Sequence, residues 1–384
     1  MSGRPSDVIV IGGGVVGSSI TYHLAKRDIK TTLVEQWDIA AAASGASAGG
    51  VRQQGRDLRE MPLAIAAIAR WEHLEAELDA DIHYYRNGHL KVIEDEADLP
   101  VLEAEVAKQR DAGLEITVVA HDTMRELVPG LGPHVIAGTY TTNDGHANPG
   151  LTARAFANAA ARYGADVRTQ TRVTGLAETG GRLTGVSTDQ GELAADWVVL
   201  ATGAWSNDVL RGIGIEAPTR PVGLQMILTT ARPAFLRQVV GSIRRPLSLK
   251  QLRAGNYLIG GGWPGDVDLR LPRGTIRPES ITGSRTTAAA IFPPLTETDI
   301  ADTWVGIEAF APDNVPILGP IPGVENLTVA FGFSGHGFAL SPITGQVISE
   351  LVIDGRSSLS LEAFNYARFA GKESEQWLPT PHAG

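Results

Sequence analysis

The chain contains no cysteine among its 384 residues. This absence excludes disulfide bonds, thiolate metal ligands and a cysteine nucleophile, so redox chemistry requires a bound cofactor. No metal site is predicted. Basic residues are also in the minority, because 33 Lys and Arg face 43 Asp and Glu, for a formal net charge of -10. This balance argues against nucleic acid or an anionic membrane surface as the main partner.

Long apolar runs are missing as well. No stretch reaches membrane-spanning length, and residues 1–7 are too short and too polar for a signal peptide, so we expect a cytoplasmic protein without a membrane span. The length and a hydrophobic content of 43% predict a large core divided between two domains.

A glycine-rich turn follows the first short apolar run, residues 8–11. Gly12, Gly14 and Gly17 form G-x-G-x-x-G where a helical pattern that includes Val16 begins. Gly12 suits the turn, Gly14 allows the backbone to approach a pyrophosphate, and Gly17 allows close packing of helix on strand. The helix amino terminus adds free N–H groups and the positive end of the helix dipole. This pattern predicts a bound dinucleotide.

An acidic residue completes the dinucleotide pattern. Glu35 ends a second predicted strand, residues 31–34, where its carboxylate accepts hydrogen bonds from ribose hydroxyls. Its charge repels a 2′-phosphate, so FAD or NAD is favoured over NADP.

A stretch of small residues, AAAASGASAGGVRQQG at 40–55, follows directly. Its composition is also typical of a flexible linker. The next segment, residues 62–78, has the pattern of an amphipathic helix that must dock, so we interpret the stretch as backbone wrapped around an extended ligand. The predicted cofactor contacts in it are Ser44, Ser47, Ala48 and Gly49.

The order of strand and helix patterns predicts an α/β protein. Residues 1–80, 148–220 and 304–370 are expected to form a discontinuous Rossmann-type nucleotide-binding domain. Residues 81–147 and 221–303 are expected to form an α+β substrate-binding domain on a mainly antiparallel sheet. Residues 371–384 are predicted to be a tail.

Three motifs in this order resemble a known family. They are GGGVVG at 12–17, ATGAWS at 201–206, and PDNVPILGP with GFSGHGFALSP at 312–320 and 332–342. They are similar to the FAD-dependent amine and amino-acid oxidases of the glycine oxidase and sarcosine oxidase group, in the D-amino acid oxidase superfamily. The resemblance covers about residues 7–369.

The resemblance implies an FAD enzyme that oxidises the C–N bond of an amine or amino acid to an imine, with O2 as acceptor and H2O2 as product. Non-covalent FAD is expected, because the chain has no cysteine and residues 43–51 contain no histidine. A helix at 343–351 is expected behind the last glycine-rich loop. The further flavin contacts that it implies are Val173, Ala201, Thr202, Gly203, Trp205, Gly335, His336, Gly337, Phe338 and Ala339.

The substrate side departs from the family. A lysine that binds the substrate carboxylate in sarcosine oxidases is replaced by Ala339, and no lysine occurs between Lys250 and Lys372. Where glycine oxidases have a carboxylate-binding arginine, the aligned residue is Glu308. A substrate as small as glycine or sarcosine is therefore less expected.

Three residues are the candidates for catalysis. Arg52 suits a substrate carboxylate, although a surface or phosphate-pairing role is an alternative. Glu308 suits the substrate ammonium or a second amine, although a residue at a packing edge or in a salt bridge is the alternative. His336, between two glycines, suits a hydrogen-bonding or steric role. Together they indicate a longer or N-substituted amino acid, including an opine-like secondary amine.

Other classes stay open at the level of sequence. One is a dehydrogenase that passes electrons to a quinone or a partner flavoprotein. Another is a non-catalytic FAD-binding subunit of a larger complex, and an NAD-dependent dehydrogenase is a more distant alternative. The expected partner is a small amine or amino acid, with a partner subunit or a homo-oligomer as further possibilities.

Overall fold

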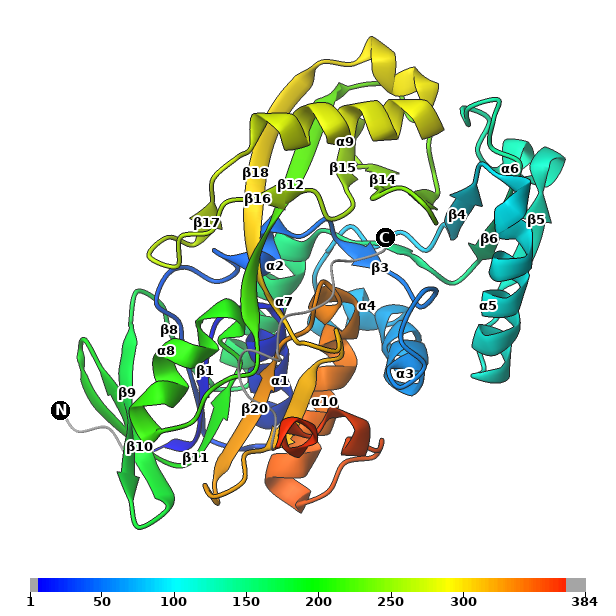
Figure 1. Cartoon of the computed structure of the whole chain (residues 1–384). Coiled ribbons are helices and arrows are strands. Elements are labelled where there is room, and N and C mark those ends of the chain that lie inside the picture. The colour runs from blue at the N-terminus through cyan, green and yellow to red at the C-terminus, as the bar shows by residue number, and fades with distance from the viewer. Residues whose placement is uncertain (1–5, 371–384) are drawn as a thin grey trace.

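The computed structural model describes residues 6–370, so the predicted tail at 371–384 lies outside the described residues. Two large β-sheets, one in the lower half of Figure 1 and one above it, organise this part of the chain. The first sheet is mostly parallel and the second mostly antiparallel, which confirms the predicted α/β fold class.

The first sheet has eight strands and contains the predicted nucleotide-binding strands. Its main order is β19 (Ile317–Pro320), β20 (Leu327–Phe331), β11 (Gly191–Leu200), β1 (Ser6–Ile11), β2 (Thr31–Val34) and β8 (Asp166–Arg168). All neighbours from β20 to β8 pair in parallel, whereas β19 is antiparallel to β20. A hairpin of β9 (Val173–Thr179) and β10 (Arg182–Thr188) continues from β11.

Strand β1 shows why this sheet is covered on both faces. Val8 and Val10 pack into the hydrophobic cluster under the helices, whereas Ile9 and Ile11 pack into the cluster on the opposite face. A strand buried on both sides has an uninterrupted apolar sequence, as seen here. The helices on the first face are α1 (Val15–Ala25), α7 (Pro149–Arg162) and α10 (Gly337–Asp354).

The second sheet has ten strands. Its order is β17 (Arg273–Gly274), β18 (Ile300–Phe310), β12 (Arg220–Ala231), β15 (Asn256–Gly260), β14 (Ser248–Gln251), β13 (Val239–Ser242), β4 (His89–Ile93), β6 (Ala137–Thr141) and β5 (Thr117–Ala120), with β16 (Pro264–Gly265) beside β12. Among the described strands of this second sheet, only the β13–β4 pair is parallel. Helix α9 (Pro278–Ile291) lies along this sheet in Figure 1, and α5 (Leu99–Asp111) and α6 (His121–Leu127) lie at its β5 end.

The remaining helices and a small strand pair complete the fold. They are α2 (Ala43–Ala46), α3 (Met61–Trp71), α4 (Leu74–Leu78), α8 (Ser206–Leu210), and the strand pair of β3 (Gly50–Val51) with β7 (Gly145–His146). Among them, α2 contacts both β18 of the second sheet and α7 of the first half.

One predicted domain boundary needs correction. The boundary at 303/304 falls inside β18, which pairs with β12 along nearly its whole length, up to Phe310 opposite Arg220. A continuous hydrogen-bonded ladder cannot change domain at its middle, so residues 304–310 belong to the second sheet. This strand carries side chains from the second sheet toward the first.

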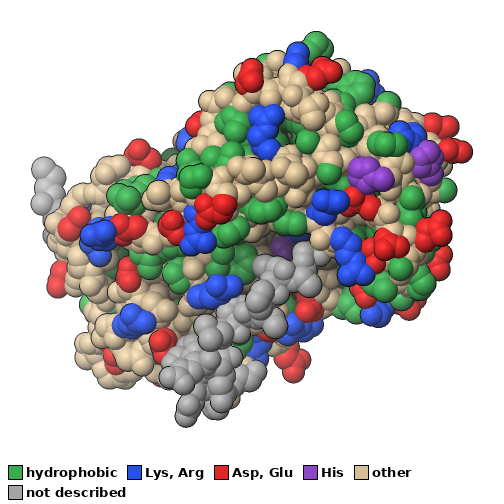
Figure 2. All heavy atoms as spheres, turned by 45° about the horizontal axis from the view of Figure 1, so that its top comes forward, with side chains coloured by type: hydrophobic (Ala, Val, Ile, Leu, Met, Phe, Trp, Pro, Cys, Tyr) green, Lys and Arg blue, Asp and Glu red, His purple; other side chains and the backbone are tan. Residues whose placement is uncertain are grey.

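The surface carries no large area of one charge on the face shown in Figure 2, where acidic and basic side chains are interspersed. Within residues 6–370, no helix has the length and apolar character that crossing a membrane requires.

Candidate active site

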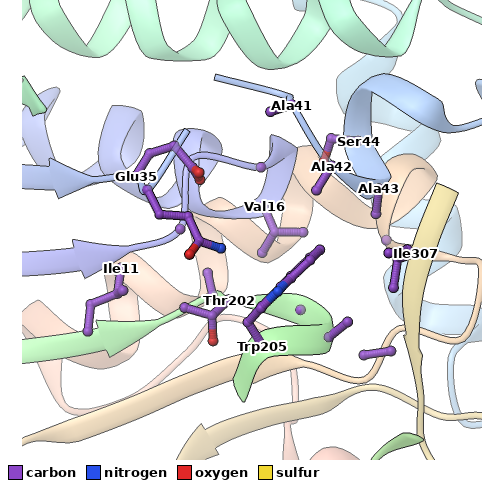
Figure 3. Close-up of a pocket in the computed structure, with 18 of the residues that line it drawn as sticks. Ile11, Val16, Glu35, Ala41, Ala42, Ala43, Ser44, Thr202, Trp205 and Ile307 are labelled. Carbon is purple, nitrogen blue, oxygen red and sulfur yellow. The ribbon is translucent and has the colours of Figure 1, made fainter. Parts of the chain in front are cut away.

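A cavity of about 430 Å³ lies at the carboxyl ends of the parallel strands (Figure 3). Gly12 follows β1, Glu35 follows β2, Ala201 follows β11 and Gly332 follows β20, and all four line it. Ligands of open α/β sheets bind at this edge. The predicted site residues that line the cavity are Gly12, Gly14, Val16, Glu35, Ser44, Ser47, Val173, Ala201, Thr202, Gly203, Trp205, Glu308, Gly335, Gly337 and Phe338.

The glycine turn leaves no space for side chains. Gly12 has a φ of +108°, and a Cβ added there would lie 2.5 Å from the Ala201 carbonyl oxygen. A Cβ on Gly17 would lie 1.9 Å from the Gly12 oxygen. Gly17 does not line the cavity, and its role is to let α1 approach β1 closely. Helix α1 has no side-chain cap at Gly14, and only the Val15 N–H of its first turn reaches a side chain, the Ser44 hydroxyl at 2.8 Å.

Glu35 lies where a ribose hydroxyl would be bound. Its Oε2 accepts the Gly13 N–H at 2.6 Å and its Oε1 accepts the Trp37 N–H at 2.8 Å. Burial raises the pKa of the carboxyl above its ordinary value, whereas these N–H groups oppose the rise. The carboxylate still has lone-pair capacity to accept from a hydroxyl donor.

An aromatic pair forms part of the wall. Figure 3 shows the Trp205 ring extending into the cavity from the segment that also carries Thr202. The Trp205 indole N–H donates to the Leu269 carbonyl at 2.7 Å, and its ring meets Trp37 edge-on with centroids 5.2 Å apart. The ring is therefore fixed rather than free to swing.

The glycine-rich loop at 335–337 presents its backbone, not its histidine, to the cavity. Gly335 and Gly337 line the cavity, and Gly335 has a φ of +87°. The His336 side chain instead lies 2.9 Å from the buried Glu60 carboxylate, through Nδ1. Burial lowers the pKa of His336 to about 4, so the imidazole is neutral at pH 7.

Glu308 is the acidic side chain that the second sheet brings to this cavity. It stands on β18 between Ile307 and Ala309, which also line the cavity. Burial raises the pKa of Glu308 to about 7, and the Gly335 N–H donates a hydrogen bond to it. No Lys, Arg or His of the described chain forms an ion pair with Glu308, so its carboxylate has no cationic partner within residues 6–370.

Several predicted site residues lie next to the cavity rather than in its lining. The Ala48 carbonyl accepts from Lys250 and the Ala339 carbonyl accepts from the Trp71 indole. The Arg52 guanidinium donates to the Gln54 carbonyl at 2.7 Å. The residues outside the lining are Gly17, Ala48, Gly49, Arg52, His336 and Ala339.

Comparison with known proteins agrees with this geometry. The family model described as FAD dependent oxidoreductase, DAO, matches residues 7–351. The chain belongs to this family.

Individual relatives of this FAD-dependent oxidoreductase come from several groups. The glycine oxidase of Pseudomonas putida is 30% identical over 356 residues, which cover 90% of this chain and 94% of that protein. The bifunctional protein ThiO/ThiG of Synechocystis is 31% identical over 95% of this chain, which spans only 54% of that longer protein. The crystal structure of L-proline dehydrogenase from P. horikoshii superposes with a TM-score of 0.90 at 29% identity, covering 95% of this chain and 98% of that one.

The residues of the cavity fit the cofactor of this family. The uncapped α1 terminus fits a pyrophosphate and Glu35 fits a ribose. The described residues contain no group of three or more His, Asp or Glu side chains arranged to hold a metal ion.

The sequence analysis missed the charged residues beside the cavity. Lys250 is fully buried on β14, and burial lowers its pKa to about 7. Arg56 and Glu60, before and at the start of α3, and Lys91 on β4 were missed as well. The one sequence signal was a lysine in SLKQ, a segment otherwise suited to a strand.

Proposed function

We propose that this oxidoreductase uses non-covalent FAD to oxidise the C–N bond of an amino acid or an N-substituted amino acid. The observation that carries the proposal is that the dinucleotide cradle and the Glu308 carboxylate share one cavity. A bound FAD would supply the acceptor for a hydride equivalent from the carbon beside the amine nitrogen, and O2 would be the final electron acceptor, reduced to H2O2. Water then hydrolyses the imine product.

Glu308 is the proposed partner of the substrate amine. Its carboxylate has no cationic partner in the described chain, and its pKa of about 7 means that it ionises near neutral pH. An ammonium group beside it supplies the missing counter-ion. Arg52 is proposed to bind the substrate carboxylate, because its partly buried guanidinium donates only one hydrogen bond to the described part of the chain, and that bond is to a carbonyl.

His336 is proposed to be a positioning residue. Through Glu60 it ties the loop at 335–337 to the start of α3. The backbone N–H groups at the start of α10, at Gly337 and Phe338, then face the cavity, where they favour negative charge. The engagement of His336 with Glu60 and the absence of cysteine support non-covalent attachment of FAD.

A dehydrogenase is the second candidate. It is supported by the similarity to a protein named L-proline dehydrogenase, and by the lack of any lysine between Lys250 and Lys372. A non-catalytic FAD-binding subunit is the third.

Anaerobic reduction tests the proposal. The purified yellow protein is mixed with glycine, sarcosine, D-amino acids, proline analogues and N-carboxyalkyl amino acids while its visible spectrum is followed. We expect one class to bleach the flavin and air to restore the colour. Restoration only by a quinone acceptor identifies the dehydrogenase, and no bleaching by any amine contradicts both enzymes. A colourless protein that FAD cannot reconstitute contradicts the cofactor.

Glu308→Arg tests the assignment of the amine site. We expect the preference of the enzyme to shift toward small amino acids, because the added guanidinium binds a carboxylate close to the reacting carbon. An unchanged preference removes Glu308 from substrate recognition.

A further inference from the structure

Four cationic side chains near the cavity form no ion pair with any carboxylate of residues 6–370. They are Arg52, Arg56, Lys91 and Lys250, and we call them the cation cluster. Arg56 is 6% exposed and Lys250 is 0% exposed, whereas Arg52 and Lys91 are partly buried. Arg52 is an electrostatic neighbour of each of the other three, so the four charges act on one another.

The acceptors of these cations are neutral oxygens. Arg56 donates through Nε and Nη2 to the Arg52 carbonyl, at 3.2 and 3.1 Å. Lys250 donates to the Ala48 carbonyl at 2.7 Å and to the Ser248 hydroxyl at 3.2 Å. The Arg56 Nη1 is buried and has no hydrogen-bond partner among residues 6–370. A buried guanidinium nitrogen without an acceptor is costly, and it indicates an acceptor that the protein itself does not provide.

Lys91 and Arg52 converge on one small space. A Cβ added to Gly55 would lie 3.3 Å from the Lys91 Nζ and 3.4 Å from the Arg52 Nη1. The Lys91 ammonium donates no hydrogen bond to any residue that the structure describes. Its acidic neighbour Glu105 is exposed and bound to Lys108 at 2.8 Å. One carboxylate placed near Gly55 therefore reaches both cations.

The two buried carboxylates of this region, Glu60 and Asp144, act electrostatically on Arg52 and Arg56 but form their hydrogen bonds with other residues. Glu60 binds His336. Asp144 accepts hydrogen bonds from neutral donors, namely the Gln53 N–H and side-chain amide, the Gln54 N–H and the Thr141 hydroxyl. With Lys250 protonated, the four cations outnumber these two carboxylates by two charges, and above the Lys250 pKa of about 7 they outnumber them by one.

Such an excess is unfavourable in a region largely removed from water. Burial accordingly lowers the pKa of Arg56 to about 9 and that of Lys91 to about 8. A ligand with two negative charges removes the imbalance.

None of the four cations lines the cavity, but two residues beside its lining, Ala48 and His336, link the cation cluster to it. Ala48, which binds Lys250, follows the cavity-lining Ser47 within the small-residue stretch. His336, an electrostatic neighbour of Arg52 and Arg56, lies between Gly335 and Gly337, which both line the cavity. The loop at 335–337 therefore lies between Glu308, which accepts the Gly335 N–H, and the two arginines that act on His336.

We propose that the substrate is a dicarboxylic amine, whose nitrogen faces Glu308 and whose two carboxylates are bound by Arg52 with Lys91 and by Arg56. This inference rests on the proposed function and narrows its substrate class to dicarboxylic amino acids and N-carboxyalkyl amino acids. It also gives a role to the unpaired Arg56 nitrogen, which a monocarboxylic substrate bound at Arg52 leaves unexplained.

Binding of unreactive acids tests the proposal without turnover. Succinate and glutarate are compared with propionate and butyrate, through the perturbation of the visible spectrum of the FAD-loaded protein and through its thermal midpoint. We expect the dicarboxylates to bind at least about tenfold more tightly. Lys91→Met and Arg56→Gln are each expected to weaken dicarboxylate binding about tenfold, and monocarboxylate binding less than twofold. Lys26→Met is the matched control, because Lys26 is paired with Glu77 on α4, away from the cluster.

Equal affinity of the native protein for mono- and dicarboxylates overturns the proposal, whether or not the variants fold. Equal weakening of both classes by Lys91→Met and Arg56→Gln also overturns it. The outcome is separable from that of the proposed function. Tight dicarboxylate binding without bleaching by any amine contradicts the oxidase and leaves the anion site standing. Bleaching by a monocarboxylic amine without dicarboxylate binding supports the oxidase and contradicts the anion site.

Discussion

The two walls of the cavity present different chemical groups. The wall from the first sheet consists of small residues such as Gly12, Gly14 and Ser44, and it offers backbone N–H groups at a helix terminus. The wall toward the second sheet offers side-chain charge, with Glu308 in the lining and the cation cluster behind it. The first wall suits the cofactor, which is the same whatever the substrate, because backbone donors need only close approach. Selection among substrates requires the side-chain charges of the second wall.

This difference predicts that the two walls respond to different kinds of substitution. The backbone wall tolerates no added atom but has few side chains to lose. The charged wall tolerates changes of shape, but a change of charge alters stability and ligand choice. The predictions below test this contrast, beginning with the largest effect.

Gly17→Ala is expected to abolish FAD binding. The new Cβ would lie 1.9 Å from the Gly12 oxygen, so helix α1 must move away from the turn. Overpacking of this kind destabilises by about 1–3 kcal/mol or more, which outweighs the gain in helix propensity of about 1 kcal/mol. Flavin absorbance after purification and the thermal midpoint measure both effects.

Gly175→Ala is the matched control on β9. A Cβ there meets no atom within 4 Å, and the residue is not in the positive-φ region. We expect a yellow protein with a stability change below about 1 kcal/mol. A Gly17→Ala protein that retains FAD with unchanged affinity removes the requirement for close packing.

Glu308→Gln is expected to stabilise the protein at high pH. The folded protein keeps the Glu308 proton up to about pH 7, whereas the unfolded chain releases it near pH 4.5. The stability that this proton contributes is present below pH 4.5 and is lost as pH rises to 7. Above pH 7 the variant is expected to gain up to about 3 kcal/mol over the parent, with little gain at pH 4.5.

Urea denaturation at pH 4.5 and pH 8, at fixed FAD concentration, measures this difference. Glu103→Gln, an exposed position on α5, is expected to show no such pH dependence. A gain of equal size at both pH values shows that desolvation of the ionised Glu308 is not its cause. The proposed function adds that the same substitution weakens substrate binding at pH 8.

The first wall was predictable from sequence, whereas of the second only Glu308 and Arg52 were named as candidates. The spacing of Gly12, Gly14 and Glu35 encodes a local unit of strand, turn and helix, so position along the chain fixes position in space. The cation cluster joins the start of α3 to β4 and β14, and nothing in the sequence places Lys91 or Lys250 beside Arg52. The partner of His336 is 276 residues away. The passage of β18 between the halves was missed for the same reason, since strand pairing is non-local.

The smallest expected effect concerns the contact between the two walls at Trp304 and Ala46, which we call the seam. The Trp304 indole N–H on β18 donates to the Ala46 carbonyl of α2 at 2.8 Å, which joins the second sheet to the cofactor wall. Trp304→Phe is expected to cost about 1 kcal/mol for this bond. Trp263→Phe removes a comparable bond, to the Pro246 carbonyl at 3.1 Å, within the second half alone. If the seam positions the cofactor wall, both variants lose similar stability, but only Trp304→Phe raises the dissociation constant of FAD, by about threefold. Equal FAD affinity in the two variants shows that the backbone wall holds its shape without support from the charged one.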